Sequence, residues 1–282
     1  MNRLTRPLAW LLGVAALLYV SACGYMWGTQ LDQVFEPSVE WQTTPARMGM
    51  AFEPLRIAVG SGAEQGELDA WWVPAEQAGA PTVVYFHGNY RNIGNNLEHT
   101  FRLHQLGFNV LLADYRGYGR SSGGKPSERK VYEDAEAVWQ YLLKVRGIPA
   151  SQAIIYGHSL GGAIAINLAV HHPEAAGLIT DSTFTSMQAM GEKDYGFLPI
   201  GWLLNQRFES LHKVPELKLP VLFIHGTWDK RVPYQMAEQL YAAAPQPKQL
   251  LLVKGGEHNN TGGIGWIEYR DAVSAFVRRN IH

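Results

Sequence analysis

The sequence lacks several features that mark whole classes of protein. It contains a single cysteine, Cys23, which excludes an intrachain disulfide and a cysteine-rich zinc site. Lys and Arg number 24 against 25 Asp and Glu, and no long block of one sign occurs, so no nucleic-acid interface is expected. No H-E-x-x-H motif is present, and the adjacent His171 and His172 would point apart on a helix, so no metal site is expected.

The composition is that of a folded chain with a large core. Hydrophobic residues make up 46% of the 282 residues and charged residues 17%, which excludes a disordered protein. The length corresponds to one large domain or two small ones, because domains usually hold about 100–200 residues.

The N-terminus has the pattern of a targeting segment. Arg3 and Arg6 lie in the first six residues, residues 7–20 are almost wholly apolar, and Val20-Ser21-Ala22-Cys23 follows. These four residues resemble a bacterial lipobox, which implies a signal peptide over residues 1–23 and a mature chain that begins at a lipidated Cys23. Gly24, in place of Asp, then favours the outer membrane.

Two other interpretations of this segment remain open. Residues 7–27 carry no charge, and about 20 apolar residues span a bilayer, so the segment could be an uncleaved signal anchor that ends near residue 27. The third interpretation is a buried core helix. In the first two, the arginines stay in the cytoplasm, and the rest of the chain is tethered on the extracytoplasmic side, in the periplasm. Residues 24–50, with Pro37 and Pro45, are predicted to form an irregular connector.

From about residue 51 short apolar runs alternate with amphipathic stretches. This alternation predicts an α/β fold with a mostly parallel central sheet covered by helices on both faces. In such sheets the site lies at the carboxyl ends of the strands. The expected strands are residues 68–73, 82–86, 109–113, 153–156, 177–180, 221–224 and 250–253, and the expected helices are 92–106, 127–145, 161–172, 234–244 and 266–279.

The clearest motif is Gly157-His158-Ser159-Leu160-Gly161, which follows an apolar strand and precedes a helix rich in small residues. This G-x-S-x-G pattern is typical of a nucleophile elbow, a strained turn that exposes a serine above the sheet. The glycines allow the turn to pass close to its neighbours. Ser159 is therefore the candidate nucleophile.

A serine nucleophile needs a base and an acid that orients the base. Asp229 follows the strand 221–224 and His258 follows the strand 250–253. The order Ser159, Asp229, His258 is that of alpha/beta hydrolases. Asp181, which ends the preceding strand, is the competing acid; otherwise it is expected to bind loop amides through hydrogen bonds.

The loop Phe86-His87-Gly88-Asn89-Tyr90 follows another expected strand and resembles an H-G-x oxyanion loop. The expected oxyanion donors are the backbone N–H groups of Asn89 and Leu160, with Tyr90 as the alternative to Asn89.

Neither a cofactor loop nor a large lid is indicated. The glycines after the strand 109–113 miss the dinucleotide-binding spacing by one residue, so no cofactor is expected. Residues 184–214 are predicted to form a small cap. Their apolar side chains suit either an acyl chain or ordinary helix packing.

The segments F-H-G-N, D-x-R-G-x-G-x-S, G-H-S-L-G-G, H-G-x-x-D-x-x-V-P and G-x-x-H occur in this order. From about residue 51 to the C-terminus the chain resembles the alpha/beta-hydrolase superfamily, in the branch of serine-aminopeptidase-like and abhydrolase-domain proteins. The resemblance implies Ser159, Asp229 and His258 as a catalytic triad, and Asn89 and Leu160 as oxyanion donors.

The function expected from these observations is a membrane-tethered serine hydrolase that cleaves carboxylic esters or thioesters. Its substrate would be a small-molecule ester, an acyl-lipid or an acylated protein. The alternatives are a peptidase on small N-terminal substrates, which would use the same triad, and a non-catalytic binding protein of the envelope.

Overall fold

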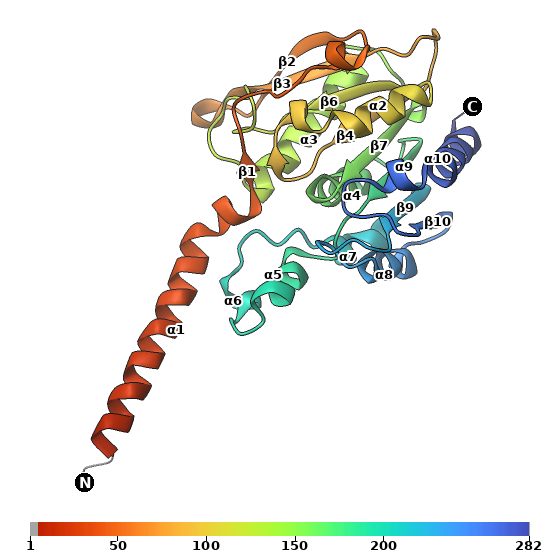
Figure 1. The fold of residues 1–282 in the computed structure, drawn as a ribbon. Helices are drawn as coiled ribbons and strands as arrows, with labels where there is room; N and C mark the ends of the chain where they lie inside the picture. Colours follow the sequence, from red (N-terminus) through yellow and green to blue (C-terminus); the bar gives the residue numbers. More distant parts are fainter. Residues whose placement is uncertain (1–4, 282) are drawn as a thin grey trace.

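The computed structural model describes residues 5–281, so Arg3 of the expected targeting segment lies outside the described residues. An α/β body carries a long helix, α1 (Thr5–Val34), which projects away from it at one side (Figure 1). By length and composition α1 could cross a membrane, since Leu8–Val34 contains an 18-residue stretch with a mean hydropathy of 1.8.

The body is built on an eight-stranded sheet in the order β10-β9-β8-β7-β4-β6-β3-β2. The strands β4 to β10 pair in parallel, while β2 and β3 join the edge in antiparallel pairs. Their bounds are β2 Glu53–Val59, β3 Gly66–Val73, β4 Thr82–Phe86, β6 Asn109–Ala113, β7 Ala153–His158, β8 Gly177–Asp181, β9 Val221–Gly226 and β10 Lys248–Val253. The predicted fold class is therefore confirmed.

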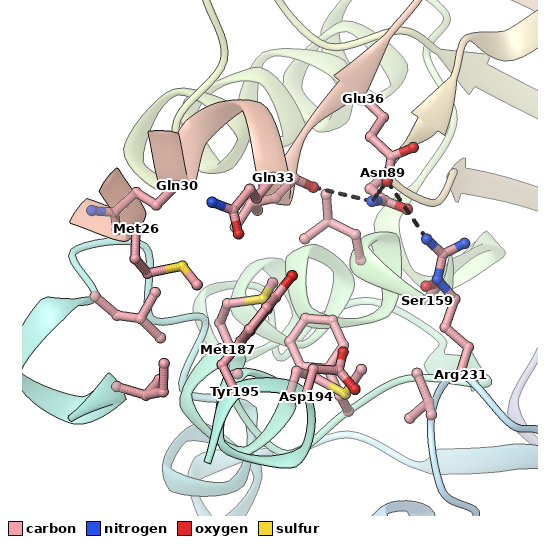
Figure 2. Close-up of a pocket in the computed structure, with 18 of the residues that line it drawn as sticks. Met26, Gln30, Gln33, Glu36, Asn89, Ser159, Met187, Asp194, Tyr195 and Arg231 are labelled. Carbon is pink, nitrogen blue, oxygen red and sulfur yellow. Dashed lines mark hydrogen bonds and ion pairs between the residues drawn. The ribbon is translucent and has the colours of Figure 1, made fainter. Parts of the chain in front are cut away.

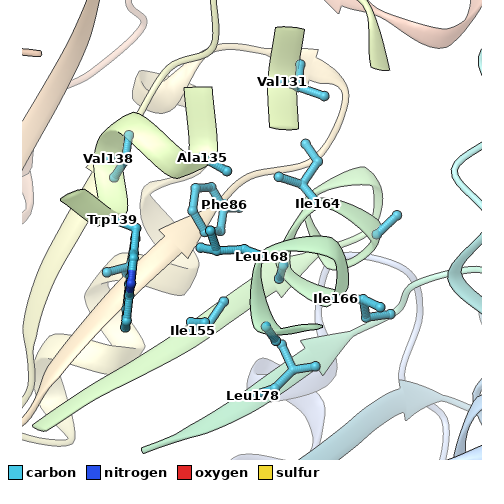
Figure 3. Close-up of a cluster of buried hydrophobic side chains, with 14 of the residues drawn as sticks. Phe86, Val131, Ala135, Val138, Trp139, Ile155, Ile164, Ile166, Leu168 and Leu178 are labelled. Atoms are coloured by element: carbon cyan, nitrogen blue, oxygen red, sulfur yellow. The ribbon is translucent and has the colours of Figure 1, made fainter. Parts of the chain in front are cut away.

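Two hydrophobic clusters hold helices against the two faces of the sheet. One joins α3 (Glu128–Lys144), α4 (Leu160–His171) and α8 (Gln235–Ala243) to the inward side chains of one face (Figure 3). The other packs α2 (Leu97–Gln105) and α10 (Trp266–Asn280) against the opposite face. The central strands have buried side chains on both faces, which explains why they appear in the sequence as continuous apolar runs.

Sequence periodicity did not indicate β2. Only alternate residues of this edge strand are buried, and the strand pairs with β3 alone. A short strand with one solvated face carries a weak apolar signal.

The expectation of an irregular chain from Gly24 was wrong for residues 24–34, because α1 continues through Cys23 to Val34. Isolated glycines such as Gly24 and Gly28 weaken a helix without ending it. The helix ends three residues before Pro37, after which the chain forms the short strand β1 (Glu36–Pro37). Cleavage before Cys23 stays a prediction.

Between β8 and β9 the chain forms the expected small cap. It contains α5 (Met187–Tyr195), α6 (Ile200–Leu203) and α7 (Ser210–Lys213). Leu198 and Ile200 of the cap pack against Met26 of α1, with Ala22 and Cys23 at the edge of the same cluster. The cap is thus held between the body and α1.

Candidate active site

Ser159 stands on a tight turn between β7 and α4. Its backbone has φ 54° and ψ −119°, which is strained for a residue with a side chain. A Cβ at Gly157 would collide with the backbone of Gly161, and a Cβ at Gly161 would collide with that of Phe86. The turn can therefore form only with glycine at both positions, as the motif predicts.

The structure brings Ser159, His258 and Asp229 into one hydrogen-bonded row. His258 Nε2 lies 3.0 Å from Ser159 Oγ, and His258 Nδ1 lies 2.7 Å from Asp229 Oδ2. An ionised carboxylate only accepts hydrogen bonds, so the Nδ1–H of His258 donates to Asp229. Nε2 is then free to accept the Ser159 hydroxyl hydrogen, which is the arrangement a general base needs.

Asp229 is held in its ionised form by four donors. Its Oδ1 accepts hydrogen bonds from the backbone N–H groups of Arg231 and Val232, each at 2.8 Å. Its Oδ2 lies 3.2 Å from His225 Nε2, besides the contact with His258. Burial alone would raise the pKa of Asp229, but the hydrogen bonds from His225, His258 and Val232 outweigh it and hold the pKa below its usual range.

Asp181, the competing acid, has different partners. Its Oδ2 accepts hydrogen bonds from Tyr156 at 3.0 Å and Thr261 at 2.7 Å, and its Oδ1 accepts one from the Ser182 hydroxyl at 3.1 Å. The expected loop amides are thus replaced by three hydroxyl groups. Burial raises the pKa of Asp181, and these hydrogen bonds only partly offset it.

Asn89 and Leu160 line the same cavity as Ser159. Leu160 is the first residue of α4, and an amide at this position has no acceptor within its own helix. On the other side, Gly88 lets the Asn89 loop approach Ser159, since a Cβ there would lie 3.4 Å from Ser159 Cβ. Tyr90, the alternative donor, lies in β5 (Tyr90–Arg91), which pairs with β1.

A contact that the sequence did not indicate ties the end of α1 to this loop. Asn89 Nδ2 lies 3.2 Å from the Val34 carbonyl oxygen and 3.3 Å from Glu36 Oε1, and it donates to both. The backbone N–H of Glu36 donates to the Asn89 carbonyl at 3.1 Å. Glu36 also forms an ion pair with Arg231 at 3.5 Å, so one side chain links the Asn89 loop to the loop that carries Asp229 (Figure 2).

His158, the first variable residue of the G-x-S-x-G motif, contacts the loop that carries His258. Burial lowers its pKa to about 3, so the ring is neutral near pH 7. Its Nε2 lies 2.9 Å from the backbone carbonyl of His258 and donates to it. His158 thereby helps to hold the His258 loop, a role that the motif alone does not reveal.

Two cavities meet at Ser159. One, of about 360 Å³, lies between α1 and the cap, with Met26, Gln30 and Gln33 facing Met187 and Tyr195 (Figure 2). The other, of about 680 Å³, lies on the His258 side and is polar. Its lining includes Tyr90, Arg91, Asn95, Asn96, His99, His158 and Asn259. Among the described residues, no group of His, Cys, Asp and Glu side chains is arranged to hold a metal ion.

A family profile described as serine aminopeptidase, S33, matches residues 78–213. The chain is 32% identical over 265 residues to an uncharacterized protein of Mycobacterium tuberculosis, covering 94% of this chain and 92% of that protein. It is 30% identical over 252 residues to the alpha/beta hydrolase domain-containing protein WAV2 of Arabidopsis thaliana, covering 81% and 80%.

The structure is similar to that of an esterase from Pyrococcus furiosus, with a TM-score of 0.71 at 20% sequence identity. The match covers 88% of this chain and 98% of that one. It also resembles an acylaminoacyl peptidase of Pyrococcus horikoshii, with a TM-score of 0.61 at 17% identity, over 82% of this chain and 42% of that one. At these identities the likeness concerns the fold.

Proposed function

Because the chain belongs to the alpha/beta hydrolases, we propose that it is a serine hydrolase which cleaves carboxylic esters or thioesters through Ser159, His258 and Asp229. The observation that carries this proposal is the hydrogen-bonded row of these three residues at the meeting point of two cavities. The solved structures of similar fold include both an esterase and a peptidase, so the choice of the ester is part of the proposal.

The reaction follows from the positions of the three side chains. His258 Nε2 takes the proton of Ser159 as the oxygen attacks the carbonyl carbon, and Asp229 stabilises the imidazolium that forms. The backbone N–H groups of Leu160 and Asn89 donate to the oxyanion. His258 then returns the proton to the leaving group, which departs and leaves an acyl-enzyme. A water molecule deprotonated by His258 releases the acid and restores Ser159.

The two cavities suggest how a substrate lies. Apolar side chains of Leu160, Phe184, Met187, Met190 and Ile200 line much of the cavity between α1 and the cap, which suits the acyl part. The polar cavity beside His258 suits the leaving group. The leaving group must lie next to the base that protonates it, so this orientation agrees with the chemistry.

We further propose that α1 tethers the enzyme to a membrane, with the body on the extracytoplasmic side. Trp10 lies near one end of its apolar stretch and Tyr25 and Trp27 near the other, and all three are exposed. Aromatic side chains at both ends of a span are typical of helices that cross a bilayer. Cleavage before Cys23 and lipid attachment there would tether the body at the same side.

The test is hydrolysis of nitrophenyl esters from acetyl to palmitoyl by the full chain in detergent. We expect a rate that Ser159→Ala lowers by about ten-thousand-fold or more, because removal of the nucleophile disables the whole triad. Ser182→Ala is a matched control, since Ser182 is a second buried serine with positive φ and bonds to Asp181.

Four outcomes are informative. A Ser159-dependent rate that peaks at medium or long chains supports the proposal in full, and a peak at acetyl restricts it to small esters. Ser159-dependent cleavage of aminoacyl nitroanilides, with no rate on any ester, would replace the ester proposal by the peptidase alternative. No Ser159-dependent rate on either class would indicate a non-catalytic binding protein.

A further inference from the structure

The cap carries an apolar segment in which two large aromatic side chains are not covered by the rest of the protein. Residues 195–204, with the sequence Tyr-Gly-Phe-Leu-Pro-Ile-Gly-Trp-Leu-Leu, contain no charged residue. Leu198 and Ile200 of this segment are buried, but Phe197 is 70% exposed and Trp202 is 94% exposed. We call residues 195–204 the apolar cap segment.

The apolar cap segment runs alongside α1 in the same direction. The Tyr19 hydroxyl donates to the Phe197 carbonyl at 3.3 Å, at one end of the contact. At the other end Gln30 Nε2 donates to the Leu203 carbonyl at 3.4 Å, and Gln30 Oε1 accepts from the Asn205 N–H at 2.8 Å. Phe197 is therefore level with Tyr19, and Trp202 lies near the level of Gln30.

The length of α1 determines how deep these levels lie if the helix spans a bilayer. No charge occurs between Arg6 and Asp32. A hydrocarbon core about 30 Å thick takes about 20 helical residues, so a span that begins after Arg6 ends near Trp27. Tyr19 lies eight residues before Trp27, which places its level about 12 Å below the outer edge of the hydrocarbon core.

From this geometry we propose that the apolar cap segment is inserted in the outer leaflet of the membrane, with Phe197 among the acyl chains and Trp202 at the interface. The proposal rests on the uncleaved form of the membrane tether proposed above, because cleavage before Cys23 would remove Tyr19. The cap is fixed to the same stretch of α1 that crosses the bilayer, so an inserted α1 carries the cap with it. The occupant of this surface is lipid. Trp is the aromatic residue most suited to the interface, and Phe suits greater depth.

The consequence concerns the substrate. Met26 and Gln30 of α1 and Tyr195, Ile200 and Leu204 of the apolar cap segment line the smaller cavity beside Ser159. This cavity therefore borders the membrane-inserted surface, and an acyl chain can pass from the leaflet to Ser159 without crossing water. The favoured substrate is an acyl ester or thioester that itself resides in the membrane.

The experiment uses the full chain with Cys23→Ser, so that one introduced cysteine carries an environment-sensitive fluorophore. Phe197→Cys and Trp202→Cys are the test positions. The matched control is Ile267→Cys, an apolar site that is 62% exposed on α10, a helix that lies far from α1 in Figure 1. Each protein is reconstituted in vesicles of phosphatidylcholine and phosphatidylglycerol with brominated acyl chains.

We expect the label at 197 to lose most of its emission and to shift to the blue, the label at 202 to be quenched less, and the label at 267 to be unaffected. Equal emission at all three positions would overturn the proposal, and so would failure of the chain to float with the vesicles. A circular-dichroism spectrum identical to that of the parent chain establishes that each variant is folded.

A second measurement separates this proposal from the proposed activity. Phe197→Ser combined with Trp202→Ser should slow hydrolysis of a palmitoyl ester embedded in vesicles several-fold and leave hydrolysis of a dissolved acetyl ester unchanged. Lipid quenching without any Ser159-dependent hydrolysis would support the membrane-inserted cap segment and reject the proposed function. Ser159-dependent hydrolysis without lipid quenching would support the proposed function and reject the membrane-inserted cap segment.

Discussion

A buried aspartate ends β8 and another lies three residues after the end of the neighbouring strand β9, and the surroundings of the two carboxyl groups differ. Asp181 at the end of β8 is surrounded by the hydroxyls of Tyr156, Thr261 and Ser182, and its pKa is raised by burial. Asp229 follows β9 and receives two backbone N–H groups and two histidines, which lower its pKa. A position at the end of a strand therefore does not make a carboxylate the partner of the base; the donors around it do.

The largest expected effect on activity is that of the substitution Asp229→Asn. An amide at this position can donate to His258 Nδ1 and favour the wrong tautomer, which cost about ten-thousand-fold in turnover number in a serine protease. We expect a loss of similar size in ester hydrolysis, measured as kcat. Asp181→Asn should lose less than about ten-fold, as expected for a group without contact to the reacting atoms. If Asp181→Asn were the more damaging change, the assignment of the acid would have to be reversed.

Removal of the Asp181 carboxyl should act on stability instead. Asp181→Ala leaves the Thr261 hydroxyl buried without its acceptor, while the Tyr156 hydroxyl keeps the Tyr269 hydroxyl at 3.2 Å. A buried group left unpaired costs about 1–3 kcal/mol, so we expect the free energy of unfolding in urea to fall by about that amount. Asp181→Asn keeps an acceptor oxygen and should lose clearly less. A fully stable alanine variant would contradict the importance of this network.

The opposite pKa shifts predict opposite effects of pH on stability. The folded pKa of Asp229 is lowered, so its stabilisation is complete above an unfolded pKa of about 4 and is lost as pH falls further. The folded pKa of Asp181 is raised, so its ionisation costs stability at high pH, and this cost disappears as pH falls.

Urea unfolding between pH 3 and pH 8 tests these signs. The stability advantage of wild type over Asp229→Asn should shrink as pH falls below about 4. Relative to Asp181→Asn, the wild type should instead become more stable as pH falls. Parallel curves for both pairs would show that neither shift exists.

The smallest expected effect concerns the link between α1 and the catalytic loops. Glu36→Ala removes the ion pair with Arg231 and one acceptor of the Asn89 side chain. Because both partners are partly exposed, stability should change by less than about 1 kcal/mol. We expect kcat to fall a few-fold through a looser oxyanion loop while KM for a short ester stays constant. Glu40→Ala serves as a control, since Glu40 is exposed and its carboxyl forms no hydrogen bond or ion pair with the described residues. A fall of the size predicted for Asp229→Asn would mean that Glu36 has a larger role than positioning.

Much of the site could be predicted from local pattern. The strands β7 and β9 are buried, β10 is a half-buried edge strand with an apolar run at its end, and parallel strands bring their carboxyl ends to one edge of the sheet. Ser159, Asp229 and His258 follow these three strands, so their meeting follows from topology. The roles of Asn89 and Leu160 as oxyanion donors remain proposals, although both residues line the cavity at Ser159.

The sequence by itself determined the strand–helix alternation, the glycines that allow the turn at Ser159 and the apolar character of α1, because each depends on residues close together in the chain. Only the tertiary structure decided which aspartate meets His258, and that Glu36 contacts both Asn89 and Arg231. It also decided that α1 forms a wall of the cavity beside the cap. These contacts join residues separated by about thirty to nearly two hundred positions. Their partners are selected by how the packed elements fit together, which no local periodicity encodes.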